Sequence, residues 1–238
     1  MPTGILQVKL GRPRGMPQRR FDRLLSEAIK SCAMARNAAI TYWLVWRRTS
    51  GWEPGGQYTP PAPKIVRKPK AKKPVDPNKK PRVSGLAPPE FLSRELYGVA
   101  VEAAPTLSTS VVSSCVQEVV QRLKSSTPYD HEGSAAKVWQ AVLLSEVSLP
   151  TWRCSGDRGT IPVPQSGGKA VLTYTEDACT LRFCLLSKRA GYRVMSQTVN
   201  LLVSDLRRGH RLRLRRMANG KLKLKDSRIV KKKGEWFV

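Results

Sequence analysis

Residues 21–46 read FDRLLSEAIKSCAMARNAAITYWLVW, and their apolar side chains recur at the period of an α-helix. The apolar stripe is formed by Phe21, Leu25, Ala28, Ile29, Cys32, Ile40 and Trp43. The cations Arg19, Arg20, Arg23 and Lys30 fall off this stripe. A stripe of this kind predicts a long amphipathic helix that buries one face and exposes cations elsewhere.

Three aromatic residues, Tyr42, Trp43 and Trp46, are expected to end this helix. Such side chains stack on nucleic-acid bases, and they also pack in protein cores. The helical spacing of Trp43 favours a core position for it. Stacking on bases stays open as the functional alternative for all three.

Further helices are predicted on the C-terminal side of this stretch. Apolar periodicity returns at Glu90–Val101, at Leu107–Leu123 and, more weakly, at Ser134–Ser145. The second of these segments carries an apolar residue at every fourth position, namely Leu107, Val111, Cys115, Val119 and Leu123. With the first helix, these segments predict a helical lobe of about four helices.

A segment of different composition interrupts the helical pattern. Residues 49–89 contain ten prolines and four glycines, and Lys64–Arg82 carries nine cations against the single Asp76. Such a composition cannot bury enough apolar surface to offset the entropy of ordering it. We therefore expect residues 49–87 to form a flexible, basic, proline-rich insert.

Short strand-like runs occupy both ends of the chain. Ile5–Leu10 precedes the first helix. The later strands are predicted at Thr160–Pro164, Ala170–Thr175, Cys179–Ser187, Arg193–Ser204, Arg211–Arg216, Lys221–Lys225 and Glu235–Val238. Short strands at this spacing predict a small β-barrel of the oligonucleotide-binding kind, so the expected fold class is α+β.

The segment Arg211–Lys225 predicts a β-hairpin. A three-residue loop with a left-handed Gly220 pairs Leu214 with Leu224, whereas a two-residue loop scrambles the two faces. The chosen register gathers six cations on one surface: Arg211, Arg213, Arg215, Lys221, Lys223 and Lys225. Like charges that face each other destabilise a sheet unless an anion lies across them. A phosphate backbone fits this surface, and a solvated strand face is the alternative.

The whole chain is strongly basic. It has 43 Lys and Arg against 17 Asp and Glu, a formal net charge of +26 and a pI near 10.5. Nucleic acid offsets such an excess, because neutralised phosphates release condensed counterions. No run approaches the roughly 18 apolar residues of a membrane span, and Met1–Leu10 lacks a signal-peptide core. We therefore expect a soluble cytoplasmic protein with no membrane partner.

Few residues suggest catalysis or metal binding. The five cysteines, Cys32, Cys115, Cys154, Cys179 and Cys184, include no C-x-x-C pair and are predicted to be reduced and buried or half-buried. The two histidines, His131 and His210, lack a neighbouring nucleophile. The carboxylate pairs Asp130/Glu132 and Glu176/Asp177 fall at turns. We predict no catalytic residue, no metal site and no cofactor on this chain.

The order of these elements resembles the N-terminal half of the type V CRISPR effectors, especially the miniature ones, and their TnpB relatives. The segments that carry the resemblance are Leu6–Leu10 leading to Phe21–Trp46, Leu107–Lys124, Leu149–Arg153 through Ile161–Pro164, and Lys231–Val238. In that family the barrel is a wedge domain split by an inserted recognition lobe. The resemblance implies a wedge barrel at residues 1–15 and 149–238 and a recognition lobe at residues 16–148.

The resemblance also implies a protein of antiviral defence in a prokaryotic cytoplasm. Its wedge domain and recognition lobe would together clamp a guide RNA and recognise target DNA with its flanking motif. The RuvC nuclease half and the zinc module of the family are missing from this sequence, so Mg²⁺ is expected only with that half. The expected protein partner is a separate RuvC nuclease chain or a second copy of this chain. The predicted RNA- and DNA-binding residues are Arg19, Arg20, Tyr42, Trp46, Trp152, Arg153, Arg207, Arg208, Arg211, Arg213, Arg215, Lys221, Lys223, Lys225, Lys231 and Lys232.

Two other functions stay open. One is a stand-alone structural RNA-binding protein of ribosomal or chaperone type. The other is a metal-independent ribonuclease that uses His131 and His210.

Overall fold

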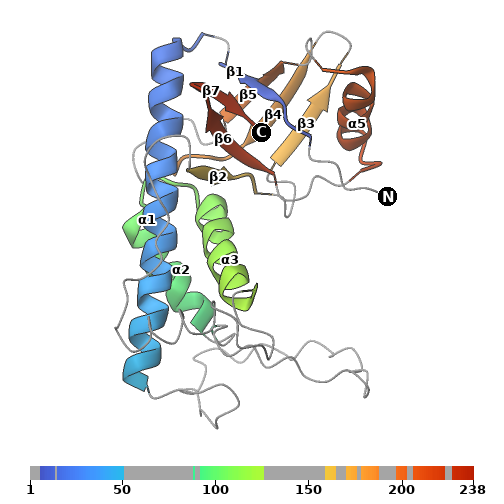
Figure 1. Ribbon diagram of the computed structural model, residues 1–238. Coiled ribbons are helices and arrows are strands. Elements are labelled where there is room, and N and C mark those ends of the chain that lie inside the picture. The colour runs from blue at the N-terminus through green and yellow to red at the C-terminus, as the bar shows by residue number, and fades with distance from the viewer. Residues whose placement is uncertain are drawn as a thin grey trace, which may run out of the picture.

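The structure is a computed structural model that describes residues 6–13, 15–50, 88, 92–125, 159–164, 170–175, 178–187, 197–202, 206–222 and 227–238. It is an α+β fold in which a helical part and a sheet are joined along one long helix (Figure 1). Several sequence predictions fall outside the described residues. They are the insert from residue 51 onward, the helix at Ser134–Ser145, the sites Trp152, Arg153, Lys223 and Lys225, and residues Asp130, His131, Glu132, Cys154, Glu176 and Asp177.

The helices confirm the predicted apolar stripes. Helix α1 spans Gln18–Ser50, α2 spans Ser93–Ala103 and α3 spans Thr109–Ser125. Every residue of both predicted stripes is buried, and Trp43 has no exposed surface, as its spacing predicted. The expected end of the first helix at Trp46 was wrong by a turn. Arg47 and Arg48 continue α1 because arginine is a strong helix former and is favourable at a helix C-terminus.

The strands form one open antiparallel sheet. Its order is β2-β6-β7-β1-β5-β4-β3. The bounds are β1 Lys9–Gly11, β2 Thr160–Pro162, β3 Ala170–Tyr174, β4 Cys179–Phe183, β5 Gln197–Leu202, β6 Arg228–Lys232 and β7 Glu235–Phe237. The N-terminal strand β1 lies inside the sheet, where it pairs with β5 and β7. The helices α1–α3 therefore lie, along the chain, between β1 and the other strands, and their role as a recognition lobe stays a prediction.

The closed barrel predicted from the sequence was wrong. Among the described residues, β2 and β3 are the two edges of the sheet and do not pair. Strand β2 is three residues long and ends at Pro162, which has no N–H to donate to a neighbouring strand. Helices α1 and α3 contact β2, and helix α5 (Arg208–Ala218) contacts β3. Both edge strands thus pack against helices instead of against each other.

A buried ion pair joins the helices to the sheet. The Arg36 side chain in α1 is 1% exposed and donates from Nε to Glu118 Oε2 of α3 at 2.8 Å. Its Nη1 also donates to the backbone oxygen of Thr160 in β2 at 3.0 Å. On the other side of Glu118, Arg228 of β6 approaches Oε1 at 3.2 Å. Three elements therefore meet at the Glu118 carboxylate, and β2 joins them through Arg36, which fixes the helical part against the sheet.

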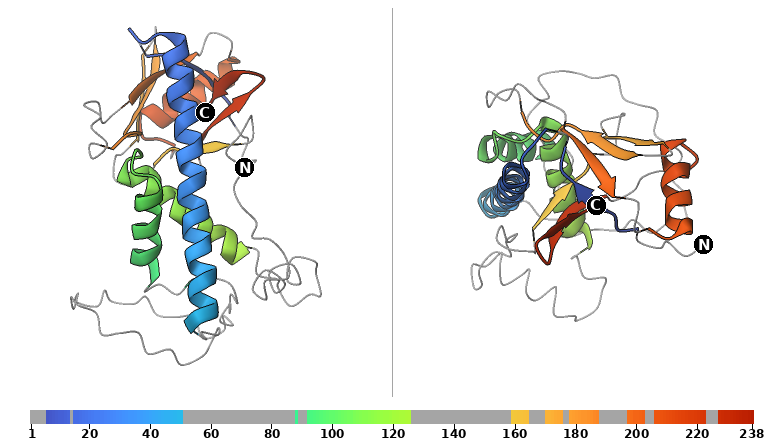
Figure 2. Two further views of the ribbon diagram at one scale, coloured as in Figure 1. Left: turned by 90° about the vertical axis from the view of Figure 1, so that its left-hand side faces the viewer. Right: turned by 90° about the horizontal axis from the view of Figure 1, so that it is seen from above.

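The predicted hairpin at residues 211–225 was also wrong, since its first strand belongs to helix α5. The hairpin of this region is instead β6–β7, with Lys233 and Gly234 at φ +48° and +82° in the two-residue turn. Positive φ at both central residues is the geometry that matches the twist of a tight hairpin. Strand β6 was missed by the sequence prediction. Helix α5 lies on the side of the sheet away from α1 (Figure 2).

Candidate nucleic-acid interface

Helix α5 forms because arginine and leucine are among the strongest helix formers. Its alternating Arg and Leu residues also match a strand, which is why the sequence pattern misled. Gly220 ends the helix with φ +71°, so the predicted left-handed conformation is confirmed, but as a helix cap and not as a hairpin loop. The N–H groups of Asn219 and Gly220 donate to Arg215 and Met217 carbonyl oxygens at 3.0 and 3.1 Å.

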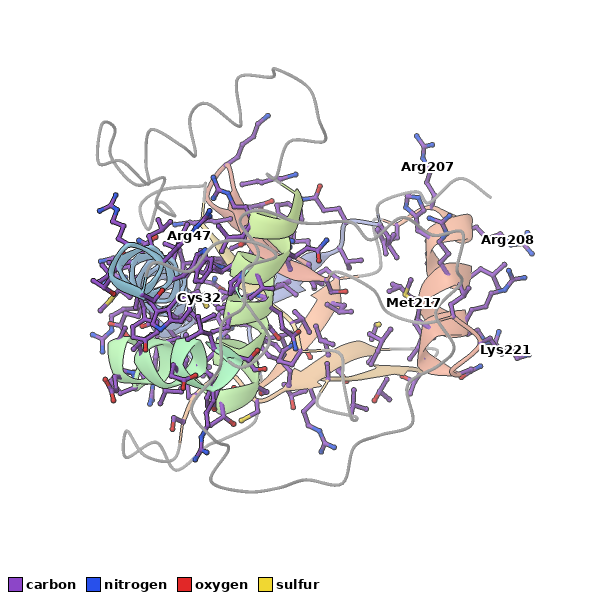
Figure 3. All side chains as sticks on the ribbon, turned by 90° about the horizontal axis from the view of Figure 1, so that it is seen from below. Cys32, Arg47, Arg207, Arg208, Met217 and Lys221 are labelled. Carbon is purple, nitrogen blue, oxygen red and sulfur yellow. The ribbon has the colours of Figure 1, made fainter. Side chains whose placement is uncertain are left out.

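One face of α5 packs against the protein. Leu214 is 3% exposed and belongs to the hydrophobic core. His210, Met217 and Ala218 are half-buried on the same side. In Figure 3, Met217 points toward the sheet, whereas Arg207, Arg208 and Lys221 point away from it. The sheet therefore holds α5 by its apolar face and leaves the other face to solvent.

The solvent face of α5 is almost entirely cationic. Its exposed side chains are Arg208, Arg211, Leu212, Arg215 and Arg216. Residues 206–222 contain seven Lys and Arg and no acidic residue. No hydrogen bond or ion pair to a described residue is formed by the side chains of Arg207, Arg208, Arg215, Arg216 and Lys221. Arg211 donates from Nε to the Leu206 oxygen at 2.9 Å.

This arrangement of cations destabilises helix α5 in the free protein. Arg207 and Arg211, and then Arg211 and Arg215, are like charges four positions apart, each pair costing about 0.2 to 0.5 kcal/mol. Arg207 occupies the N-cap position without a side-chain cap, and no acidic residue stands in the first turn. Cations near a helix N-terminus oppose the helix dipole. A polyanion across this face would remove these costs.

The β6–β7 hairpin carries a second group of cations, but they are partly engaged. The Lys231 ammonium lies 5.5 Å from the centre of the Trp236 ring. Lys232 donates to Gln7 Oε1 at 3.2 Å, and Lys9 forms an ion pair with Glu235. Trp236 is buried and donates from Nε1 to Asp22 Oδ1 of α1 at 2.8 Å. These lysines thus help to hold the hairpin, and their net positive charge remains at the surface.

The predicted binding residues on α1 lie far apart. Arg19 and Arg20 are exposed at its N-terminal end, whereas Tyr42 and Trp46 are half-buried near its C-terminal end. From Arg20 to Trp46 the helix rises about 40 Å. The Trp46 ring stacks on Trp43 with centroids 5.7 Å apart, so one of its faces is already covered. The predicted residues therefore fall into separate groups on α5, on the hairpin and at the two ends of α1.

Two residues of the α5 face, Leu212 and Arg216, were absent from the predicted binding residues. Both follow from helical spacing, since positions 208, 212, 215 and 216 share a helix face. The Asn219–Gly220 pair is the signal that could have found them. It ends a helix as readily as it turns a hairpin.

The cysteine thiols of the described residues are free and packed in the interior. Cys32, Cys115 and Cys179 are buried and Cys184 is half-buried, as the sequence predicted. Burial raises the pKa of Cys32 well above its ordinary value, and a hydrogen bond with the Cys115 thiol raises it further. Burial raises the pKa of Cys179 to about 11. Cys32 and Cys179 thus stay protonated at neutral pH and serve as packing groups.

Within the described ranges, no three His, Cys, Asp or Glu side chains are grouped to hold a metal ion. Likewise, none of the described helices has the length and apolar character of a membrane span. No protein-family model matches the chain, and no curated protein matches it. The cationic face of α5 is thus the best-defined candidate site.

Proposed function

We propose that this chain binds nucleic acid, and that it holds a guide RNA together with target DNA and its flanking motif without cutting either. The single observation that carries the proposal is the solvent face of α5, where four arginines surround Leu212 without an acidic neighbour in residues 206–222. The net charge of +26 supports it, because such an excess is offset by phosphates. A RuvC nuclease chain or a second copy would complete the assembly.

The order of the elements supports the guided form of this proposal. A strand, then helices, then the remaining strands of the same sheet is the order expected for a wedge domain split by a recognition lobe. The Arg36–Glu118–Arg228 contacts fix the two parts against each other. A rigid two-part frame is suited to hold a guide–target duplex by its shape and backbone.

The test is to purify the chain from cells and to sequence the RNA that remains bound. A unique RNA of defined length supports the guided function. Mixed cellular RNA favours a structural RNA-binding protein of ribosomal or chaperone type. A chain that binds neither RNA nor DNA at low salt overturns the proposal.

A cleavage assay tests the second part of the proposal. The chain incubated with guide RNA, target DNA and Mg²⁺ is expected to leave both strands intact. Cleavage of the RNA that is lost in a His210→Ala variant would instead support the ribonuclease alternative.

A further inference from the structure

The side chains on the solvent face of α5 are ordered around the helix axis. At about 100° per residue, Arg211 and Arg216 lie on opposite flanks of this face, about 140° apart. Arg208, Leu212 and Arg215 lie between them, on the crest. Leu212 is 48% exposed. The crest therefore presents two guanidinium groups and one apolar side chain, with a further cation on each side.

We infer that α5 enters the major groove of a B-form DNA duplex, with Arg208 and Arg215 facing base edges and the flanking arginines facing the two phosphate walls. This inference rests on the proposed nucleic-acid function and names the form of nucleic acid that α5 takes. A flat or single-stranded partner would leave one flank without phosphates. The crest arginines have the donors that pair with guanine O6 and N7.

The dimensions favour DNA over RNA. An α-helix with its side chains is about 10 to 12 Å wide, and the B-DNA major groove is about 12 Å wide. The major groove of A-form RNA is deep and too narrow for side chains to read. Residues 206–222 contain no Phe, Tyr or Trp that could stack on unpaired bases, and their one histidine, His210, is half-buried on the face that packs against the protein. Duplex DNA thus fits α5 better than duplex RNA or a single strand.

The position of α5 permits this approach. It lies at the outer side of the sheet, and Arg207, Arg208 and Lys221 point outward from the molecule (Figure 3). A membrane surface is the other polyanion that a basic helix can meet. However, the apolar face of α5 is already packed through Leu214, and Leu212 alone is exposed among its leucines.

The experiment compares two variants of the full chain that lose the same charge. The test variant carries Arg208→Gln and Arg215→Gln. The control carries Arg94→Gln and Arg182→Gln, two exposed arginines on α2 and β4. Affinities are measured for a 20-base-pair DNA duplex, the matching RNA duplex and a single strand, over a range of salt. Arg208→Lys with Arg215→Lys keeps the charge and tests the guanidinium geometry.

We expect the test variant to lose at least tenfold in affinity for duplex DNA and at most threefold for the RNA duplex and the single strand. The control should lose affinity equally for all three nucleic acids. The unchanged protein should prefer G·C-containing duplexes, and the lysine variant should keep the salt dependence but lose part of this preference, because an ammonium lacks the planar two-donor fork of a guanidinium. With the unchanged protein, guanine N7 atoms, which lie in the major groove, should be protected from dimethyl sulfate. Equal losses for all three nucleic acids, a larger loss for duplex RNA, or binding to anionic vesicles in place of DNA would each overturn it. The nucleic-acid function itself would fail only if the unchanged chain bound no nucleic acid.

Discussion

Arg36 and Glu118 form a charged pair in which the arginine is 1% exposed and the carboxylate 19% exposed, with Nε and Oε2 2.8 Å apart. The Arg36 guanidinium has been withdrawn from water, so the carboxylate is its main compensation. Thr160 supplies the remaining acceptors from β2. The pair therefore holds the helical part against the sheet, because separating Arg36 from Glu118 would leave a buried charge without its counter-charge.

Glu118→Ala should destabilise the protein by about 3 kcal/mol, because it leaves a buried guanidinium without its counter-charge. The matched control is Glu27→Ala on α1, whose ion pair with Arg23 is exposed and should contribute no more than about 0.5 kcal/mol. Urea denaturation of both variants measures the difference. Equal midpoints would show that the buried pair does not hold the two parts together.

Gly159→Ala should also be destabilising. A Cβ at this position would lie 2.0 Å from Cγ2 of Ile29 in α1, so helix and strand would have to separate. Overpacking of this kind costs about 1 to 3 kcal/mol. Ile29→Ala in the same chain should recover part of the loss, which thermal unfolding of the single and double variants would reveal. Strict additivity of the two changes would contradict the close contact.

Gly209→Ala provides the opposite control. This glycine lies in α5 with nothing within 4 Å of a Cβ. Alanine should stabilise the helix by up to about 1 kcal/mol and increase its helicity. A loss of stability here would contradict a helix that begins at Arg208.

The two leucines of α5 distinguish the helix from the hairpin more directly. Leu214 is 3% exposed and Leu212 is 48% exposed, whereas a strand would place both on one buried face. Leu214→Ala should cost about 2 to 4 kcal/mol, and Leu212→Ala should change stability by less than about 0.5 kcal/mol. Chemical denaturation of the two variants gives the answer. Equal losses of stability in the two variants would support the hairpin in place of the helix.

Alkaline pH should weaken the fold through Cys179. Its folded pKa of about 11 exceeds the ordinary 9.0, so the folded state retains a proton that the unfolded chain releases. The stability from this thiol is complete below about pH 9 and falls by about 1.4 kcal/mol per pH unit as pH rises toward 11. Cys179→Ala should lose this part of the pH dependence. Parallel curves for both proteins between pH 9 and 11 would rule the thiol out as the cause.

The helices could be predicted from the sequence because their stripes are long. The repeat from Leu107 to Leu123 permits one buried face, and all five of its residues are buried. The strand–helix–strand order and several strand positions followed from turn residues and local pattern. The shape of the sheet could not be predicted in this way, because no local pattern determines whether β2 and β3 pair with each other or pack against helices.

The error at α5 has a physical reason. Leu212 and Leu214 alternate with arginines, so period two is satisfied locally, yet both residue types prefer helix. Tertiary packing decides the outcome by burying Leu214 alone. The Arg36–Glu118 pair was equally hidden, because its partners lie 82 positions apart in the chain. The prediction of a cationic surface at residues 207–221 holds for a helix as it did for a strand, because it depends on composition.

The place of β1 inside the sheet bears on how this protein is made. Val8 and Val238 exchange two backbone hydrogen bonds, at 2.8 and 2.9 Å, and Lys9 pairs with Phe237. A ribosome delivers β1 first, and that strand must wait for β5 and β7 before it has neighbours. During this interval α1, α2 and α3 can already assemble from local contacts, since helices form faster than distant strand pairs. Translation speed up to Leu202, where β5 ends, then sets how long β1 is presented to the cell without a paired strand.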